Sequence, residues 1–278
     1  MKAFLFQKWF FDATIANGDY FFIFITRIAL FGKDKIFIEA HGGGEELCQA
    51  ELNSVEVNDN LIKTRQGTII LGENQISLSL NVENFSIEAT WASRLSSRPP
   101  VNKFMIKKCT GRLRWEPLFI NSDVSGEVKI NGENKYSLIK ESGYVDYVDS
   151  TFLPLLMPVK TIYWGRLMSK EIDLTFTIVS RTMSRKQKSK IYLVYNRNVI
   201  EFDEVNMVIS EQKATPDSSL VYPEKYMFEA QNDGYRLKVD IFDHNISVAS
   251  DFIKDAKQYS TSPSCLGEPI LNSCPAIA

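Results

Sequence analysis

The segment ESGYVDYVDS, residues 141 to 150, places two carboxylates among aromatic and β-branched side chains. In an extended chain successive side chains point to opposite faces, so Asp146 shares a face with Tyr144, whereas Tyr147 and Asp149 share the other. A carboxyl group that faces an apolar cavity has its pKa raised by desolvation and can protonate a double bond or a carbonyl. Asp146 is therefore the candidate acid. The alternative is that both aspartates mark a turn between domains.

Other kinds of catalytic site lack their parts. The four cysteines form no C-x-x-C pair, and the two histidines, His41 and His244, lie far apart in the chain, so we expect no metal site. There is neither a G-x-S-x-G nucleophile motif nor a Walker loop, and we expect no cofactor. Whether Cys265 and Cys274 pair stays open.

Composition favours a soluble globular protein. Of 278 residues, 44% are hydrophobic and 24% are charged, and the net charge of -2 gives no reason to expect nucleic acid. The basic run RTMSRKQKSK, residues 181 to 190, is interpreted as a solvated loop. The longest apolar stretch, residues 20 to 31, contains Arg27 and is too short for a membrane-spanning helix. We expect no stable membrane insertion and a cytoplasmic location.

Short strands separated by turn residues account for most of the chain. Asn17-Gly18 between two aromatic and β-branched runs predicts a long-armed hairpin. Strand spacings of about 8 to 12 residues favour barrels or sandwiches over βαβ units, and no long helical period appears. The expected fold is all-β with few short helices, in domains spanning residues 1 to 153 and 154 to 258. Residues 259 to 278 form a tail that is loose or extended.

Several motifs in the correct order resemble one family. Residues 8 to 13 (KWFFDA) with Asn17-Gly18, then residues 111 to 115 (GRLRW), residues 143 to 147 (GYVDY) and residues 163 to 166 (YWGR), are similar to segments of two-domain lipocalin-like proteins. That family includes carotenoid 1,2-hydratase (hydroxyneurosporene synthase), tocopherol cyclase-like proteins and fungal decalin-forming Diels-Alderases. The resemblance implies two lipocalin-like β-barrel or sandwich domains packed side by side, with an aromatic ligand cleft between them.

One departure from the family pattern bears on the activity. Its G-Y-H-D-H-N-W-G signature reads here G-Y-V-D-Y-V-D-S, so Val145 and Tyr147 replace both histidines. Hydration needs a proton donor and a positioned water, whereas folding a polyene into a reactive conformer can by itself supply about 7 to 11 kcal/mol of barrier reduction. The leading hypothesis is therefore an intramolecular cyclase, of Diels-Alderase or pericyclase type, acting on a hydrophobic polyene, polyketide or isoprenoid.

Roles follow for the residues that the resemblance and the local pattern single out. Asp146 is the acid or hydrogen-bonding anchor with Tyr144 beside it, and Arg166 is its potential counter-ion. The remaining predicted substrate-binding residues are Tyr147, Trp115, Trp164 and Asp149. Two alternatives stay open: a hydratase or isomerase of an isoprenoid double bond, and a carrier of a lipid or pigment that performs no chemistry.

Overall fold

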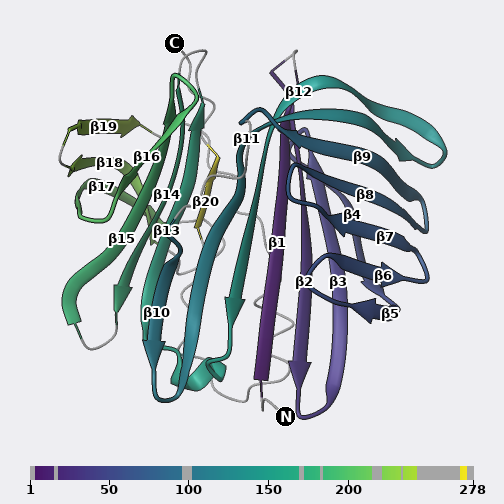
Figure 1. Cartoon of the computed structure of the whole chain (residues 1–278), viewed down its shortest axis with the longest axis horizontal. Helices are drawn as coiled ribbons and strands as arrows, with labels where there is room; N and C mark the ends of the chain where they lie inside the picture. The colour runs from purple at the N-terminus through teal and green to yellow at the C-terminus, as the bar shows by residue number, and fades with distance from the viewer. Residues whose placement is uncertain are drawn as a thin grey trace. The chain divides into compact units, whose positions relative to one another are not determined.

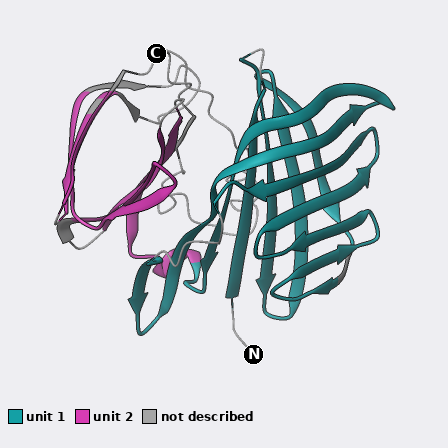
Figure 2. Cartoon of the chain, turned by 45° about the horizontal axis from the view of Figure 1, so that its top comes forward, with its two compact units in different colours: residues 1–153 teal, residues 154–278 magenta. Residues whose placement is uncertain are grey.

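A computed structural model describes residues 4–15, 18–95, 102–168, 172–181, 184–214, 221–232, 234–242 and 270–273. Within these ranges the chain is almost entirely β-strand, and the one helical segment is the short 3-10 helix η1 (Pro154–Leu156). The all-β prediction is therefore confirmed. The chain divides into two compact units between Leu153 and Pro154, coloured separately in Figure 2. In the described part of the chain, no helix is long and apolar enough to cross a membrane.

Unit 1 is built on one strongly curled antiparallel sheet of twelve strands, labelled in Figure 1. Its strand order is β4-β3-β2-β1-β12-β11-β9-β8-β7-β6-β5, and β10 pairs with β11 outside this path. The strands are β1 (Phe4–Thr14), β2 (Tyr20–Leu30), β3 (Lys33–Gly42), β4 (Glu45–Leu52), β5 (Ser54–Val57), β6 (Leu61–Thr64), β7 (Gly67–Leu71), β8 (Gln75–Val82), β9 (Phe85–Ser93), β10 (Phe104–Lys108), β11 (Gly111–Ile130) and β12 (Glu133–Ser150).

The predicted hairpin is confirmed as the β1–β2 pair. Its register runs from Phe4 opposite Leu30 to Thr14 opposite Tyr20. Gly18 has φ of 85°, a left-handed conformation that glycine adopts without steric cost. Asn17 lies outside the described residues. Strand β1 also pairs with β12, so the first and last strands of unit 1 are neighbours.

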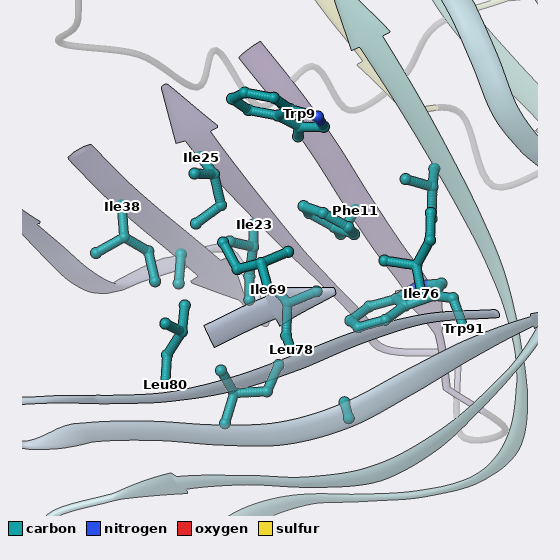
Figure 3. Packing of buried hydrophobic residues seen from close by; sticks show 14 of the residues in the cluster. Trp9, Phe11, Ile23, Ile25, Ile38, Ile69, Ile76, Leu78, Leu80 and Trp91 are labelled. Atoms are coloured by element: carbon teal, nitrogen blue, oxygen red, sulfur yellow. The ribbon is translucent and has the colours of Figure 1, made fainter. Parts of the chain in front are cut away.

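The concave face of this sheet encloses the main hydrophobic core. Side chains from β1, β2, β3, β7, β8 and β9 point toward one another in Figure 3, among them Trp9, Phe11, Ile23, Leu78 and Trp91. Strand β8 alternates buried and solvent-facing residues, as expected for a sheet with one covered face. Strand β2 differs, because every residue from Phe21 to Thr26 is buried. The sheet around β2 is thus covered on both faces.

Unit 2 contains a five-stranded sheet, order β16-β15-β14-β13-β20, and a three-stranded sheet, order β17-β18-β19. The strands are β13 (Val159–Met168), β14 (Ile172–Arg181), β15 (Ser184–Tyr195), β16 (Asn198–Phe202), β17 (Val205–Ala214), β18 (Val221–Gln231), β19 (Arg236–Phe242) and β20 (Ile270–Ser273). Strand β20 pairs in parallel with β13, so this part of the predicted tail is extended. The rest of the tail lies outside the described residues.

The interpretation of residues 181 to 190 as a solvated loop is wrong. Residues from Ser184 onward belong to β15, and Lys190 is only 2% exposed. Its Nζ donates to Glu201 at 2.6 Å and to Asp203 at 2.8 Å. A lysine can be buried where carboxylates pair with its charge. The two carboxylates that pair with Lys190 lie 11 and 13 residues further along the chain.

Candidate active site

Asp146 lies at the centre of a buried polar cluster on unit 1. Its side chain is only 3% exposed, and its Oδ2 accepts a hydrogen bond from Trp115 Nε1 at 2.8 Å and another from the Tyr144 hydroxyl at 3.0 Å. Tyr144 is fully buried and Trp115 is 3% exposed. The structure therefore brings together three residues that the sequence singled out.

Strand register explains why these side chains meet. Tyr144 and Asp146 are two positions apart on β12 and so project from the same face. Trp115 on β11 is paired with Val148, which is two positions beyond Asp146 on that same face. Diagonal neighbours on paired strands are within reach of a long aromatic side chain, so the indole extends to the carboxylate.

The environment of Asp146 keeps its carboxyl group protonatable near neutral pH. Burial raises its pKa to about 7, because desolvation disfavours the charged form. The hydrogen bonds from Trp115 and Tyr144 and the positive charge of Lys8 oppose this rise, whereas the negative charge of Asp12 adds to it. Both the protonated and the ionised forms are thus accessible near neutral pH, and the group can act either as a proton donor or as a proton acceptor.

Three phenylalanines, Phe10, Phe22 and Phe24, form an aromatic patch on the same face of the sheet. Phe10 is paired with Asp146 on one side and with Phe24 on the other. The ring of Phe10 lies 5.1 Å from that of Phe24 and 6.0 Å from that of Phe22, and 6.1 Å from the Tyr144 ring. The aromatic patch is buried and lies directly beside the carboxyl group of Asp146.

Further charged groups border the aromatic patch. Lys8 Nζ stands 3.5 Å from the centroid of the Phe24 ring, and desolvation lowers the pKa of this lysine to about 8, although the charges of Glu39 and Asp146 oppose the change. Glu39 is 6% exposed, and its Oε1 lies 2.7 Å from His41 Nε2. The His41 ring in turn stacks on Phe22 with centroids 4.8 Å apart. One face of the sheet thus carries Lys8, Glu39, His41 and Asp146 around the three phenyl rings of the aromatic patch.

Tyr147 and Asp149, predicted to bind substrate, lie on the opposite face. Tyr147 packs against Trp9 of the main core with ring centroids 5.1 Å apart, and its hydroxyl accepts from Gln7 Nε2 at 2.6 Å. Asp149 is 1% exposed and accepts from Arg112 Nε at 3.1 Å and from Arg114 Nε at 2.6 Å. Asp149 and the two arginines thus form an ion-pair cluster that links strands β11 and β12.

Trp164 and Arg166 lie on strand β13 of unit 2. Arg166 is 5% exposed, and its Nη2 lies 3.6 Å from Asp173 Oδ1 on the neighbouring strand β14. Arg166 thus takes part in an ion pair within unit 2. Its role as the counter-ion of Asp146 stays a prediction.

Sequence reasoning missed Lys8, Phe10, Glu39 and His41 as members of the site. The alternation of side chains along an extended strand could have placed them together. Lys8, Phe10 and Asp12 share one face of β1, and Glu39 and His41 share one face of β3. A charged residue on a strand that is buried on both faces is unusual and marks a functional position. What the sequence lacked was the knowledge that the outer face of this sheet is covered.

The described cysteines show no sign of catalytic or metal-binding chemistry. Cys48 is partly buried and its pKa is raised to about 11, mainly by desolvation, so it is a thiol rather than a reactive thiolate. Cys109 is exposed. No group of three or more His, Cys, Asp or Glu side chains suited to a metal ion occurs within the described ranges. Cys265 and Cys274 fall outside them.

Comparison with known proteins shows the fold. No protein-family model matches the chain, and no curated protein matches it at a significant level. Among solved structures, kievitone hydratase from Nectria haematococca is similar with a TM-score of 0.55 and 12% identity, over 88% of this chain and 78% of that one. A protein provisionally assigned as AttH from Nitrosomonas europaea is similar with a TM-score of 0.51 and 12% identity, over 80% of this chain and 76% of that one.

These similarities establish an all-β, lipocalin-like architecture, as the sequence predicted. One of the two similar proteins carries the name of a hydratase, and neither is a Diels-Alderase or a tocopherol cyclase. At 12% identity the likeness extends to the fold alone, so the chemistry must be argued from the side chains of this chain.

Proposed function

We propose that this protein adds water to, or removes water from, a carbon–carbon double bond of a hydrophobic small molecule, with Asp146 as the catalytic acid or base. The observation that carries the proposal is the buried carboxyl group of Asp146, protonatable near pH 7, at the edge of the aromatic patch. The architecture shared with a structure named kievitone hydratase supports the same reading.

The hydrogen bonds to Asp146 support different proposed roles for its two oxygens. Both Trp115 and Tyr144 donate to Oδ2, which leaves Oδ1 as the oxygen that exchanges a proton with the substrate. In the hydration direction Oδ1 delivers its proton to one carbon while water bonds to the other. The two donors then stabilise the carboxylate that remains. A positioned general acid of this kind contributes about 10² to 10⁴ in rate.

The cyclase hypothesis rests on weaker support. The aromatic patch would suit the folding of a polyene, because shape and orientation alone can drive an intramolecular cyclisation. Such a reaction, however, does not require a carboxyl group held at a pKa of about 7 in a buried site. A carrier would not require it either. Both therefore serve as alternative outcomes of the test below.

The test follows what happens to the ligand. Purified protein is incubated with an extract of cells that lack it, in ordinary water and in water enriched in heavy oxygen, and the products are compared by mass spectrometry. We expect one compound to gain or lose one water, with the heavy isotope present in the hydrated species. A product of unchanged mass with new retention would support the cyclase, and a compound retained unaltered would support the carrier.

Variants connect the activity to the site. Asp146→Asn keeps the size of the side chain and an acceptor oxygen but cannot exchange a proton, so we expect turnover to fall by about 10² or more with ligand binding preserved. Asp123→Asn is the matched control, because Asp123 lies on the same strand as Trp115, is partly exposed and forms its ion pair with Arg94. Full activity of Asp146→Asn would reject the assignment.

A further inference from the structure

In the part of the chain that the structure describes, the N–H donors of the Lys8 ammonium have no hydrogen-bond partner. Among the described residues, the only close partner seen for its Nζ is the face of the Phe24 ring at 3.5 Å, and no hydrogen bond or ion pair reaches it. Glu39 and Asp146 are near enough to act on it electrostatically but do not bond to it. An ammonium has three N–H donors, and a partly buried one that leaves them without a protein partner carries a desolvation cost.

The position of this ammonium limits the charge that can develop on a substrate at Asp146. If Asp146 protonated an isolated double bond, a carbocation would form within range of a fixed positive charge, and repulsion would raise the barrier. If negative charge developed instead, the same ammonium would stabilise it. The site is therefore suited to a substrate whose electrons move onto an oxygen during the reaction.

We propose that Lys8 binds a carbonyl oxygen that is conjugated with the reacting double bond, so that the substrates are hydrophobic α,β-unsaturated carbonyl compounds. This inference rests on the proposed function and specifies its substrate class. The planar conjugated system lies against the aromatic patch of Phe10, Phe22 and Phe24, the carbonyl oxygen accepts from Lys8 Nζ, and the carbon next to the carbonyl faces Asp146.

The electron flow balances in this arrangement. The oxygen of water bonds to the β-carbon, the π electrons of the double bond shift toward the carbonyl, and the resulting enolate oxygen is held by Lys8. Asp146 Oδ1 gives its proton to the α-carbon as the carbonyl re-forms. The proton lost by the attacking water returns to Asp146 through solvent. The product is a β-hydroxy carbonyl compound, and the reverse sequence dehydrates it.

The binding of two defined probes tests this inference without requiring turnover. Chalcone carries a conjugated carbonyl, and diphenylpropene is the hydrocarbon in which a methylene replaces that carbonyl. Binding to the full-length protein is measured by quenching of tryptophan fluorescence, since Trp115 lies in the site. We expect chalcone to bind about ten- to a hundredfold more tightly than diphenylpropene, the range of a hydrogen bond to a charged donor.

Variants assign the preference to the lysine. Lys8→Met should abolish the preference for chalcone, and Lys8→Arg should retain part of it. Lys63→Met, which changes an exposed lysine on β6, is the matched control and should bind like the wild type. An independent readout on the unmodified protein is the absorption band of bound chalcone, which should shift to longer wavelength when its oxygen accepts from an ammonium.

The outcomes separate this inference from the proposed function. Equal binding of the two probes to the wild type, no absorption shift, or an unchanged preference in Lys8→Met would overturn the role of Lys8 while leaving the hydration test standing. A Lys8-dependent preference for chalcone together with no gain or loss of water in the extract experiment would overturn the proposed reaction and leave a site that binds conjugated carbonyl compounds.

Discussion

The indole of Trp115 on β11 donates a hydrogen bond of 2.8 Å to the carboxylate of Asp146 on β12. This contact connects two residues separated by 31 positions in the chain, and both are buried. It fixes the position of one carboxylate oxygen, Oδ2. This cluster and its surroundings lead to five predictions.

The free energy of unfolding should depend on pH through Asp146. Its folded pKa is about 7 and its ordinary value is 3.8, so between these pH values the folded state holds a proton that the unfolded state has lost. The contribution of Asp146 to the free energy of unfolding is therefore fully present below about pH 4 and is lost as pH rises to about 7, by up to about 4 kcal/mol. The lowered pKa of Lys8 acts above pH 8 and lies outside this window.

Asp146→Asn removes that titration. Relative to the wild type, the variant should become more stable between pH 5 and 7.5, because the cost of burying a carboxylate is gone. Urea unfolding followed by tryptophan fluorescence at several pH values measures the difference. Parallel curves for the two proteins would show that Asp146 does not titrate in this range.

Tyr144→Phe should raise the pKa of Asp146 above about 7. The hydroxyl donates to the carboxylate at 3.0 Å and so favours the charged form, and the substitution removes this donor while preserving the ring. NMR of protein labelled at the aspartate carboxyl carbons would follow the titration directly. An unchanged titration would mean that the tyrosine hydroxyl does not bind the carboxylate in solution.

Asp149→Asn should lower stability and leave the chemistry of the site intact. Asp149 is 1% exposed and paired with two arginines. Because Arg112 and Arg114 are 41% and 23% exposed, water can solvate them after the change, and we expect a loss of about 1 to 3 kcal/mol. Chemical denaturation measures the loss of stability, and the incubation in water enriched in heavy oxygen measures activity. Together they distinguish this variant from Asp146→Asn. A stable protein without activity would instead place Asp149 in the reaction.

Gly143→Ala should strain the sheet directly beneath the site. A Cβ at this position would overlap Val124 Cγ2 and lie 2.7 Å from the carbonyl oxygen of Asp12, which is closer than packed atoms approach. We expect a loss of about 1 to 3 kcal/mol. Because Trp91 Nε1 donates to the same carbonyl at 2.7 Å, the near-ultraviolet circular dichroism of the tryptophans should change as well. Gly234→Ala serves as the comparison, because an added Cβ there would meet no atom within 4 Å and the glycine does not have a left-handed conformation.

The local sequence pattern was sufficient to predict the strands. The β1–β2 hairpin and the shared face of Tyr144 and Asp146 follow from turn chemistry and from the two-residue period of an extended chain. Pattern failed at Lys190, because the carboxylates that allow this lysine to be buried come from a later part of the chain. Charge in a short window predicts solvent exposure only when no distant partner compensates for burial.

The candidate site likewise combines features that the local sequence predicts with features that depend on the tertiary structure. The sequence by itself identified Asp146 as an acid with a bulky aromatic neighbour, since both features lie within a few residues of one another. Only the tertiary structure decided that Trp115 and Lys8 act on that carboxyl group while Tyr147 and Asp149 face the opposite side. The physical reason is that the pKa and the partners of a buried group depend on strand register and on what covers the sheet, and both are set by residues far apart in sequence.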